Sequence, residues 1–433
     1  MIGTRAGSGM TRRRAARSRS ACVARSWPAC LGRSWPTCVV TAALLVAIAA
    51  CGRGAPTPVA GASRLTPNST GDALTVLSAS FVSASAGWLL ATPCADQVAT
   101  CRTVVMRETA DGGRTWFAVP APDAPPADMF QGSPPANAVG SIVFTGGGEG
   151  WAFGPALWQI RDGGATWQKM SVPGGPVQDL AVAGDRVLAV TGRCGEGRWA
   201  CSFRVYWAAA GSDDWRAVPG AVGTGVSSAR LVVSAGVGYI SGDAGRVSGG
   251  VGYMSGDVGY VFATRAGLGP PLLLAGPVNG SAGWRPVPVP CRGAWSGALA
   301  VAPGDWLFLG CGLEPGAGNQ FKAAWVSGDG GQSWRQVASP PFGGYLDGAS
   351  MSPGGTIFLS GSRMDLYISR DRGRSWDESP SLDNAAGLAD AGLSLAGSTI
   401  TSTRGFAVQE GVGQQQIWLT SDGGRQWTAV TVR

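Results

Sequence analysis

Short apolar runs separated by turn residues recur along this chain. Between residues 140 and 173, the runs SIVF, GWAFG, LWQIR and TWQKMSVP are separated by glycine-rich turns. Apolar runs of this length between such breakers are typical of β-strands, and four in succession predict an antiparallel meander. Long helical periodicity is absent outside the N-terminus. The pattern therefore predicts an all-β chain of short, four-stranded units.

The four-strand pattern repeats. Seven similar phrases end in tryptophan at intervals of 42 to 69 residues, and these are Trp116, Trp167, Trp215, Trp284, Trp334, Trp376 and Trp427. Self-similarity at this period indicates a repeat architecture in which each unit completes its core against its neighbours. The first apolar run of each unit is expected to line a central channel. The fourth run ends in proline in six copies, which suits an outer edge strand because proline lacks a donor.

Five of the phrases contain an aspartate with glycine two residues later, as in TADGGRTW at residues 109–116. An aspartate side chain can accept hydrogen bonds from backbone N–H groups ahead of it, and glycine supplies the positive φ that such a turn needs. The tryptophan is expected to pack at the base of the hairpin, where it can bury a large apolar area.

These phrases resemble the Asp-box, or BNR repeat, of pattern Ser/Thr-x-Asp-x-Gly-x-Ser/Thr-Trp. The match is complete at residues 109–116, 327–334 and 369–376, whereas residues 160–167 depart at Ile160 and residues 420–427 depart at Gln426. The resemblance implies a seven-bladed β-propeller of four-stranded antiparallel blades, similar to the photosystem II assembly-factor-like and sialidase-like families. It assigns a structural role to Asp111, Gly113, Trp116, Asp162, Gly164, Trp167, Asp329, Gly331, Trp334, Asp371, Gly373, Trp376, Asp422, Gly424 and Trp427.

The N-terminus has the pattern of an export signal. Eight arginines and no acidic residue lie within residues 1–50, and the apolar run CVVTAALLVAIAA precedes Cys51. The run is too short for a comfortable membrane span, and Ile48–Cys51 resembles a bacterial lipobox. We predict a lipoprotein signal at 1–50, lipidation of Cys51, a Pro/Gly/Ser-rich tether at 51–71 and the propeller at 72–433. An ordinary signal peptide and secretion are the alternative.

Six cysteines follow Cys51. Cys94 and Cys101 are seven residues apart, and so are Cys194 and Cys201, and both pairs precede a phrase tryptophan by similar intervals. The matched positions favour one local disulfide in each pair, which leaves Cys291 and Cys311 as the third. An even count outside the cytoplasm fits disulfides, although six cysteines allow many pairings. Zinc is the weaker alternative, because CxxC spacing and histidine are both absent.

Composition excludes several kinds of chemistry. The chain contains no histidine, which removes histidine-based nucleophilic catalysis and histidine metal sites. Without residues 1–50 the charge is nearly balanced, so the folded part gives no electrostatic case for nucleic-acid binding. No cofactor, metal or catalytic residue is expected.

Two open alternatives concern surface residues. A sialidase-like site would need converging arginines and a tyrosine, for which Arg265, Arg285, Arg292 and Arg363 with Tyr345 or Tyr367 are available, but the expected N-terminal arginine motif is missing. Tryptophans outside the phrases are interpreted as core residues, with stacking on sugars as the alternative, and these are Trp158, Trp199, Trp207, Trp295 and Trp325.

One unit is lengthened by a tandem duplication, in which VGYISGDAGRVSGG at 237–250 is followed by VGYMSGDVGYVFAT at 251–264. We expect an extended hairpin or loop there, which is either idle or part of a binding surface. The preferred functional hypothesis is a non-catalytic scaffold, lipid-anchored at the outer face of a bacterial cell membrane, that binds an envelope protein. The alternative is a propeller that binds or cleaves glycans at the cell surface.

Overall fold

The computed structural model describes most of the predicted propeller. The described residues are 74–93, 101–127, 134–145, 148–162, 166–194, 201–233, 239–242, 258–265, 270–362, 366–379, 395–401, 403–409 and 416–433, and all belong to the unit Pro56–Arg433, the second of two units. Every regular element among them is a β-strand, so the all-β prediction is confirmed. No helix in these ranges is long and apolar enough to cross a membrane.

Four sheets consist of four antiparallel strands in chain order, which confirms the predicted meander. The sheet read from residues 140–173 contains β5 (Ser141–Phe144), β6 (Gly150–Phe153), β7 (Leu157–Ile160) and β8 (Trp167–Met170). The other three contain β17 (Ser296–Ala302), β18 (Trp306–Gly316), β19 (Asn319–Ser327) and β20 (Arg335–Gln336); β21 (Leu346–Met351), β22 (Ile357–Gly361), β23 (Leu366–Ser369) and β24 (Asp377–Glu378); and β25 (Leu395–Thr399), β26 (Gly405–Gln409), β27 (Gln416–Thr420) and β28 (Thr428–Thr431).

A seven-stranded sheet joins two such groups through one long strand. Its strands are β9 (Val177–Ala183), β10 (Arg186–Cys194), β11 (Cys201–Ala209), β12 (Arg216–Val233), β14 (Val258–Arg265), β15 (Leu272–Pro277) and β16 (Arg285–Pro286). The first part of β12, from Arg216 to Val226, pairs with β11, and the second part, from Val226 to Val233, pairs with β14. β12 is therefore the outer strand of one group and the inner strand of the next.

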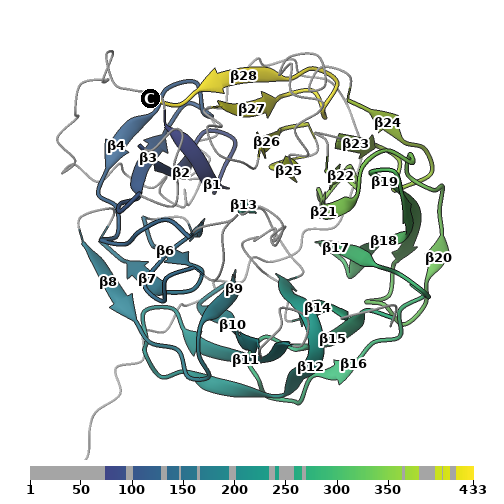
Figure 1. Ribbon diagram of the computed structural model, residues 1–433, viewed down its shortest axis with the longest axis horizontal. Helices are drawn as coiled ribbons and strands as arrows, with labels where there is room; N and C mark the ends of the chain where they lie inside the picture. The colour runs from purple at the N-terminus through teal and green to yellow at the C-terminus, as the bar shows by residue number, and fades with distance from the viewer. Residues whose placement is uncertain are drawn as a thin grey trace, which may run out of the picture. The chain divides into compact units, whose positions relative to one another are not determined.

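The remaining sheet has five strands, because part of the duplicated segment joins it. β1 (Thr75–Phe81), β2 (Gly87–Thr92), β3 (Val105–Thr109) and β4 (Phe117–Val119) form the meander, and β13 (Tyr239–Gly242) pairs antiparallel with β1. Figure 1 shows β13 near the centre of the ring of strands. The sequence predicted an extended hairpin or loop over 237–264, of which residues 243–257 lie outside the described residues; the pairing with β1 was not predicted. β1 offers unpaired backbone groups on its inner edge, and a strand from a distant segment satisfies them.

The sheets follow one another around a central axis (Figure 1). Inner strands of successive sheets pack together, as β1 does with β5, β17 with β21, and β21 with β25. The first and last sheets also meet, since Leu74 N donates to Val432 O at 3.0 Å and the rings of Phe81 and Phe406 lie 5.2 Å apart. This arrangement is that of a β-propeller, in which each sheet buries both faces against its neighbours.

Neighbouring sheets are aligned, so the same kinds of turn lie at the same end of each sheet. Ile142 N and Phe144 N donate to the hydroxyls of Ser78 and Ser80, so β1 and β5 run in the same direction. We call the end that holds the aspartate-containing turns the turn face. We call the opposite end, which holds the hairpins between second and third strands and the connections between sheets, the connection face.

Candidate functional site

The aspartate turns on the turn face are closed hydrogen-bond systems. In the first, Asp111 Oδ1 accepts bonds from Thr109 Oγ1, Arg114 N and Thr115 N at 2.9 Å each, and Oδ2 accepts from Thr115 Oγ1 at 2.6 Å. Gly113 N donates back to Thr109 Oγ1 at 2.9 Å, with Gly113 at φ 91°. The Ser/Thr, Asp and Gly of the motif thus bind one another.

The same contacts recur at Asp329 and Asp371. Where the motif departs, the matching bond is missing. Gln426 stands where the motif has Ser or Thr, so Asp422 has no hydroxyl donor at that position. Asp422 accepts bonds from the backbone N–H groups of Arg425 and Gln426 and from the hydroxyl of Thr420. At the second turn, Asp162 accepts from Thr166 N at 3.1 Å and Thr166 Oγ1 at 2.6 Å; Gly164 lies outside the described residues.

Hydrogen bonds keep the turn carboxylates ionised. The bonds from Ser333 and Ser327 lower the pKa of Asp329 to about 2. Partial burial acts to raise the pKa of Asp111, but bonds from Thr115, Thr109 and Arg114 outweigh it, and the pKa falls. A carboxylate that has lost its proton is a poor general acid. The bonds to backbone N–H groups hold the backbone of each turn.

The tryptophans after these turns connect neighbouring sheets. Trp167 Nε1 donates to Pro120 O at 2.9 Å, Trp334 Nε1 to Pro288 O at 2.8 Å, and Trp376 Nε1 to Ala338 O at 2.9 Å. In each case the acceptor lies just after the fourth strand of the preceding sheet. The sequence predicted a tryptophan at the base of each hairpin. Its hydrogen bond to the preceding sheet could not be predicted, because that requires knowing which sheets are adjacent.

The cysteines that the structure describes lie toward the connection face. Cys291 and Cys311 form a disulfide with a Cα–Cα distance of 5.7 Å, which ties the segment before β17 to β18. Cys101 and Cys201 are also disulfide-bonded, and Cys201 lies opposite Cys194 in the β10–β11 register. Cys51, Cys94 and the side chain of Cys194 lie outside the described residues.

The described residues considered for a sialidase-like site are divided between the two ends of the sheets. The Tyr367 side chain is fully buried, and its hydroxyl donates to Gly343 O at 2.9 Å. Arg285 lies at the turn face, whereas Arg292 lies in the connection before β17 at the opposite end. Arg363 and the side chain of Arg265 are outside the described residues.

Exposed aromatic side chains gather at the connection face of the β17–β20 sheet and its link to β21. Phe321 is 61% exposed and Phe342 is 43% exposed, and their ring centroids lie 4.6 Å apart. Tyr345 follows in the same connection and is 39% exposed. We call Phe321, Phe342 and Tyr345 the aromatic platform. Sequence reasoning missed it, because only tertiary structure shows that these residues are exposed and adjacent.

A buried lysine holds the loop beneath the aromatic platform. Lys322 is 4% exposed, and its ammonium donates to the carbonyl oxygens of Pro341 and Gly344 at 3.1 Å and of Phe342 at 3.3 Å. It also bonds Gly343 O and lies 5.3 Å from the centre of the Tyr367 ring. The carbonyl dipoles and the ring face stabilise the buried charge, which fixes the loop conformation.

Tryptophans outside the motif differ in exposure. Trp158, Trp207 and Trp325 are partly buried, and the Trp207 ring lies 4.7 Å from the Arg186 guanidinium. Trp295 is 51% exposed at the connection face, and Trp199 lies outside the described residues. Within the ranges that the structure covers, no group of three acidic or cysteine side chains could hold a metal ion.

No protein-family model and no curated protein matches this chain. Solved structures of low similarity include YCF48 bound to D1 peptide, with a TM-score of 0.48, 18% identity, and coverage of 82% of this chain and 94% of that chain. YCF48 from Cyanidioschyzon merolae gives 0.44 and 15%, covering 81% and 96%. Trypanosoma rangeli sialidase in complex with 2,3-difluorosialic acid gives 0.36 and 13%, covering 62% and 49%. With TM-scores below 0.5, these likenesses carry no argument about activity or partner.

Proposed function

We propose that this chain is a non-catalytic seven-bladed propeller scaffold that binds an envelope protein through its connection face. The aromatic platform is the observation that supports this role most strongly. Aromatic side chains are enriched at the centres of protein interfaces, where they give large contact area at low entropic cost. A rigid backing adds to the effect, because a loop that is already ordered loses less entropy on binding.

The proposed blade count follows from dividing the seven-stranded sheet at β12. The four four-stranded sheets, the meander of β1–β4 and the two groups joined by β12 then give seven blades. The Asp-box assignment is supported by the shared contacts of Asp111, Asp329 and Asp371. In this proposal the Asp-box turns are structural, and binding takes place at the other end of the propeller.

The connection face also has a chemical preference for its partner. Exposed arginines lie there beside the second-to-third-strand hairpins and the connections between sheets, namely Arg102, Arg193 and Arg292. Glu314, near the end of β18, is exposed in the same hairpin as Phe321, so the connection face carries charges of both signs. We therefore propose a partner surface with apolar side chains and charges of both signs.

The proposed location is the outer face of a bacterial cell membrane, with lipid on Cys51 and residues 51–71 as a tether. The pattern of residues 1–51 supports this, and the disulfides fit an oxidising compartment. An intact-mass measurement of the mature protein tests it. A mass starting at Cys51 with added acyl groups is expected, whereas an unmodified mass that includes residues 1–50 would contradict it.

Co-purification from native membranes tests the binding role. A C-terminal tag leaves Cys51 intact, and crosslinked wild-type protein should retain a near-stoichiometric envelope protein. Changing Phe321 and Phe342 together to serine should reduce recovery of that protein at least about tenfold, the effect of losing about 1.4 kcal/mol. The control changes Arg335 and Arg374, which are exposed at the turn-face half, to serine. Equal recovery from both variants would contradict the proposal.

A further inference from the structure

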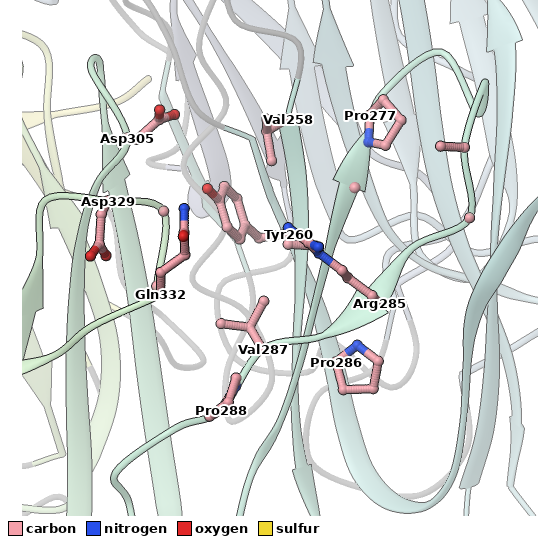
Figure 2. A pocket seen from close by; sticks show the side chains of 16 residues that line it. Val258, Tyr260, Pro277, Arg285, Pro286, Val287, Pro288, Asp305, Asp329 and Gln332 are labelled. Carbon is pink, nitrogen blue, oxygen red and sulfur yellow. The ribbon is translucent and has the colours of Figure 1, made fainter.

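A cavity of about 730 Å³ lies near the turn face between the sheet that ends in β16 and the β17–β20 sheet. Figure 2 shows its walls, with Tyr260 from β14 near the middle and Asp305 and Asp329 at one side. Small residues of β15 and of the turn before β16 line one side of the cavity. Ala275, Gly276, Ala282 and Gly283 line one wall, where the turn sequence NGSAGW lacks an aspartate.

Tyr260 supplies a hydroxyl to the cavity wall. The residue is 1% exposed, and among the described residues its hydroxyl makes no hydrogen bond, although it lines the cavity. Burial, with Asp305 nearby, raises the pKa of Tyr260 to about 12, so the hydroxyl keeps its proton at neutral pH. The ring of Tyr260 is therefore held in the core, while its hydroxyl lines the cavity and is open to a bound group.

Three other polar side chains line the cavity, namely Asp305, Arg285 and Gln332. The Asp305 carboxylate is exposed on the β17–β18 turn, at φ 59°. The Arg285 guanidinium is exposed and forms no ion pair within the described ranges. In Figure 2, the Arg285 and Gln332 side chains extend toward Tyr260. The Asp329 oxygens, in contrast, are engaged within their own turn.

The walls between these polar groups are apolar. Val258, Val287, Pro286 and Pro288 supply most of this surface. The lining thus combines one carboxylate, one guanidinium, one amide and one phenol with aliphatic patches. A cavity of this volume, mainly apolar with a few placed polar groups, has the usual character of a small-ligand site.

We propose that this cavity binds a sugar residue. Each sugar hydroxyl both donates and accepts, so it can pair with the acceptor Asp305, the donor Arg285, or the Tyr260 hydroxyl. The C–H faces of the ring match the valine and proline walls. The opposite charges of Asp305 and Arg285 suit a neutral ligand better than a strongly charged one. The site lies at the opposite end of the sheets from the aromatic platform, so it is independent of the proposed protein interface.

Saturation-transfer NMR on the full-length protein tests the proposal, with glucose, galactose, mannose and N-acetylglucosamine as probes. At least one sugar should give a saturable signal with a Kd of about 1 mM, typical of a few hydrogen bonds on a small ligand. Tyr260→Phe removes only the hydroxyl and should weaken that binding at least about fivefold, without lowering the melting temperature.

Arg285→Gln should also weaken binding, and the chain offers a matched control. Arg335 begins β20 directly after Trp334, as Arg285 begins β16 directly after Trp284, so Arg335→Gln should leave sugar binding unchanged. Because Arg285 is exposed, its variant remains informative even if Tyr260→Phe perturbs folding. Saturation transfer to none of the four sugars would overturn the proposal, and so would equal binding by wild type and both cavity variants.

Discussion

At the scale of single residues, buried polar groups connect parts of the propeller that lie far apart in sequence. Asp179 on β9 is 2% exposed and accepts bonds from Leu180 N at 2.9 Å and from Leu231 N, on β12, at 2.7 Å. Trp334 and Lys322 act in the same way, with one hydrogen-bonding side chain fixing a neighbouring sheet or loop.

Trp334→Phe should lower the free energy of unfolding by about 1–3 kcal/mol, because it removes the bond to Pro288 O and part of a half-buried ring. Denaturant titration of the full-length protein measures this. Trp295→Phe is the control, since Trp295 is half exposed and should change stability by less than about 0.5 kcal/mol. A Trp334→Phe protein as stable as the control would show that the contact between sheets is unimportant.

Asp179 should make stability depend on pH. Burial raises its pKa to about 6 despite the bonds from Leu231 and Leu180, so the native state holds a proton that the unfolded chain loses near pH 4. Stability from this group therefore falls as pH rises from about 4 to about 6, by up to about 3 kcal/mol. Asp179→Asn cannot titrate, so its destabilisation relative to wild type should be larger at pH 4 than at pH 7. Denaturation at both pH values measures the difference, and a pH-independent effect would contradict the assignment.

Lys322→Met should leave the carbonyl oxygens of residues 341–344 without their donor. We expect a loss of about 1–3 kcal/mol in stability and faster amide exchange around the aromatic platform. Lys169→Met is the matched control, because Lys169 is the other lysine and is exposed beside the Trp158 ring. Exchange mass spectrometry compares the two variants. Unchanged exchange at residues 341–344 in Lys322→Met would contradict the role of the ammonium.

At the scale of elements, local pattern predicts strands well and long-range pairing poorly. The apolar runs and turn residues at 140–173 suffice for the four-stranded meander, because both signals are local. The pairing of β13 with β1 could not be predicted, since the two strands are about 160 residues apart and strand register depends on which edges are free. The aromatic platform and the hydroxyl of Tyr260 were likewise invisible, because exposure and hydrogen bonding are tertiary properties.

Deleting residues 237–250 should remove β13 and leave the rest of the propeller folded, because the similar VGYMSG that takes its place is separated from β14 by one residue only and is too close to it to pair with β1. The remaining copy of the duplication retains β14 but leaves a shorter link between β12 and β14. The inner edge of β1 would then lose its partner, so amides of residues 75–81 should exchange faster while the melting temperature changes by only a few degrees. Exchange mass spectrometry of this segment is the measurement, and unchanged protection would indicate that β13 is not needed to cover β1.

At the scale of the whole propeller, the two ends differ in the side chains that they present. The turn face holds hydrogen-bonded aspartates that stabilise hairpins, together with the cavity at Tyr260. The connection face holds the aromatic platform, exposed arginines and the Cys291–Cys311 disulfide. Function could be predicted only as a class from the sequence, because a propeller supports many functions and the binding surface depends on which side chains emerge at each end.

Site-specific photo-crosslinking tests the central claim most directly. A photoreactive phenylalanine analogue at position 342 places the crosslinker on the aromatic platform, and the same analogue at position 374 places it on the opposite face. In native membranes, position 342 should capture one envelope protein in high yield, and position 374 should not. Capture of that protein from position 374 alone, or of none from position 342, would contradict a protein-binding connection face.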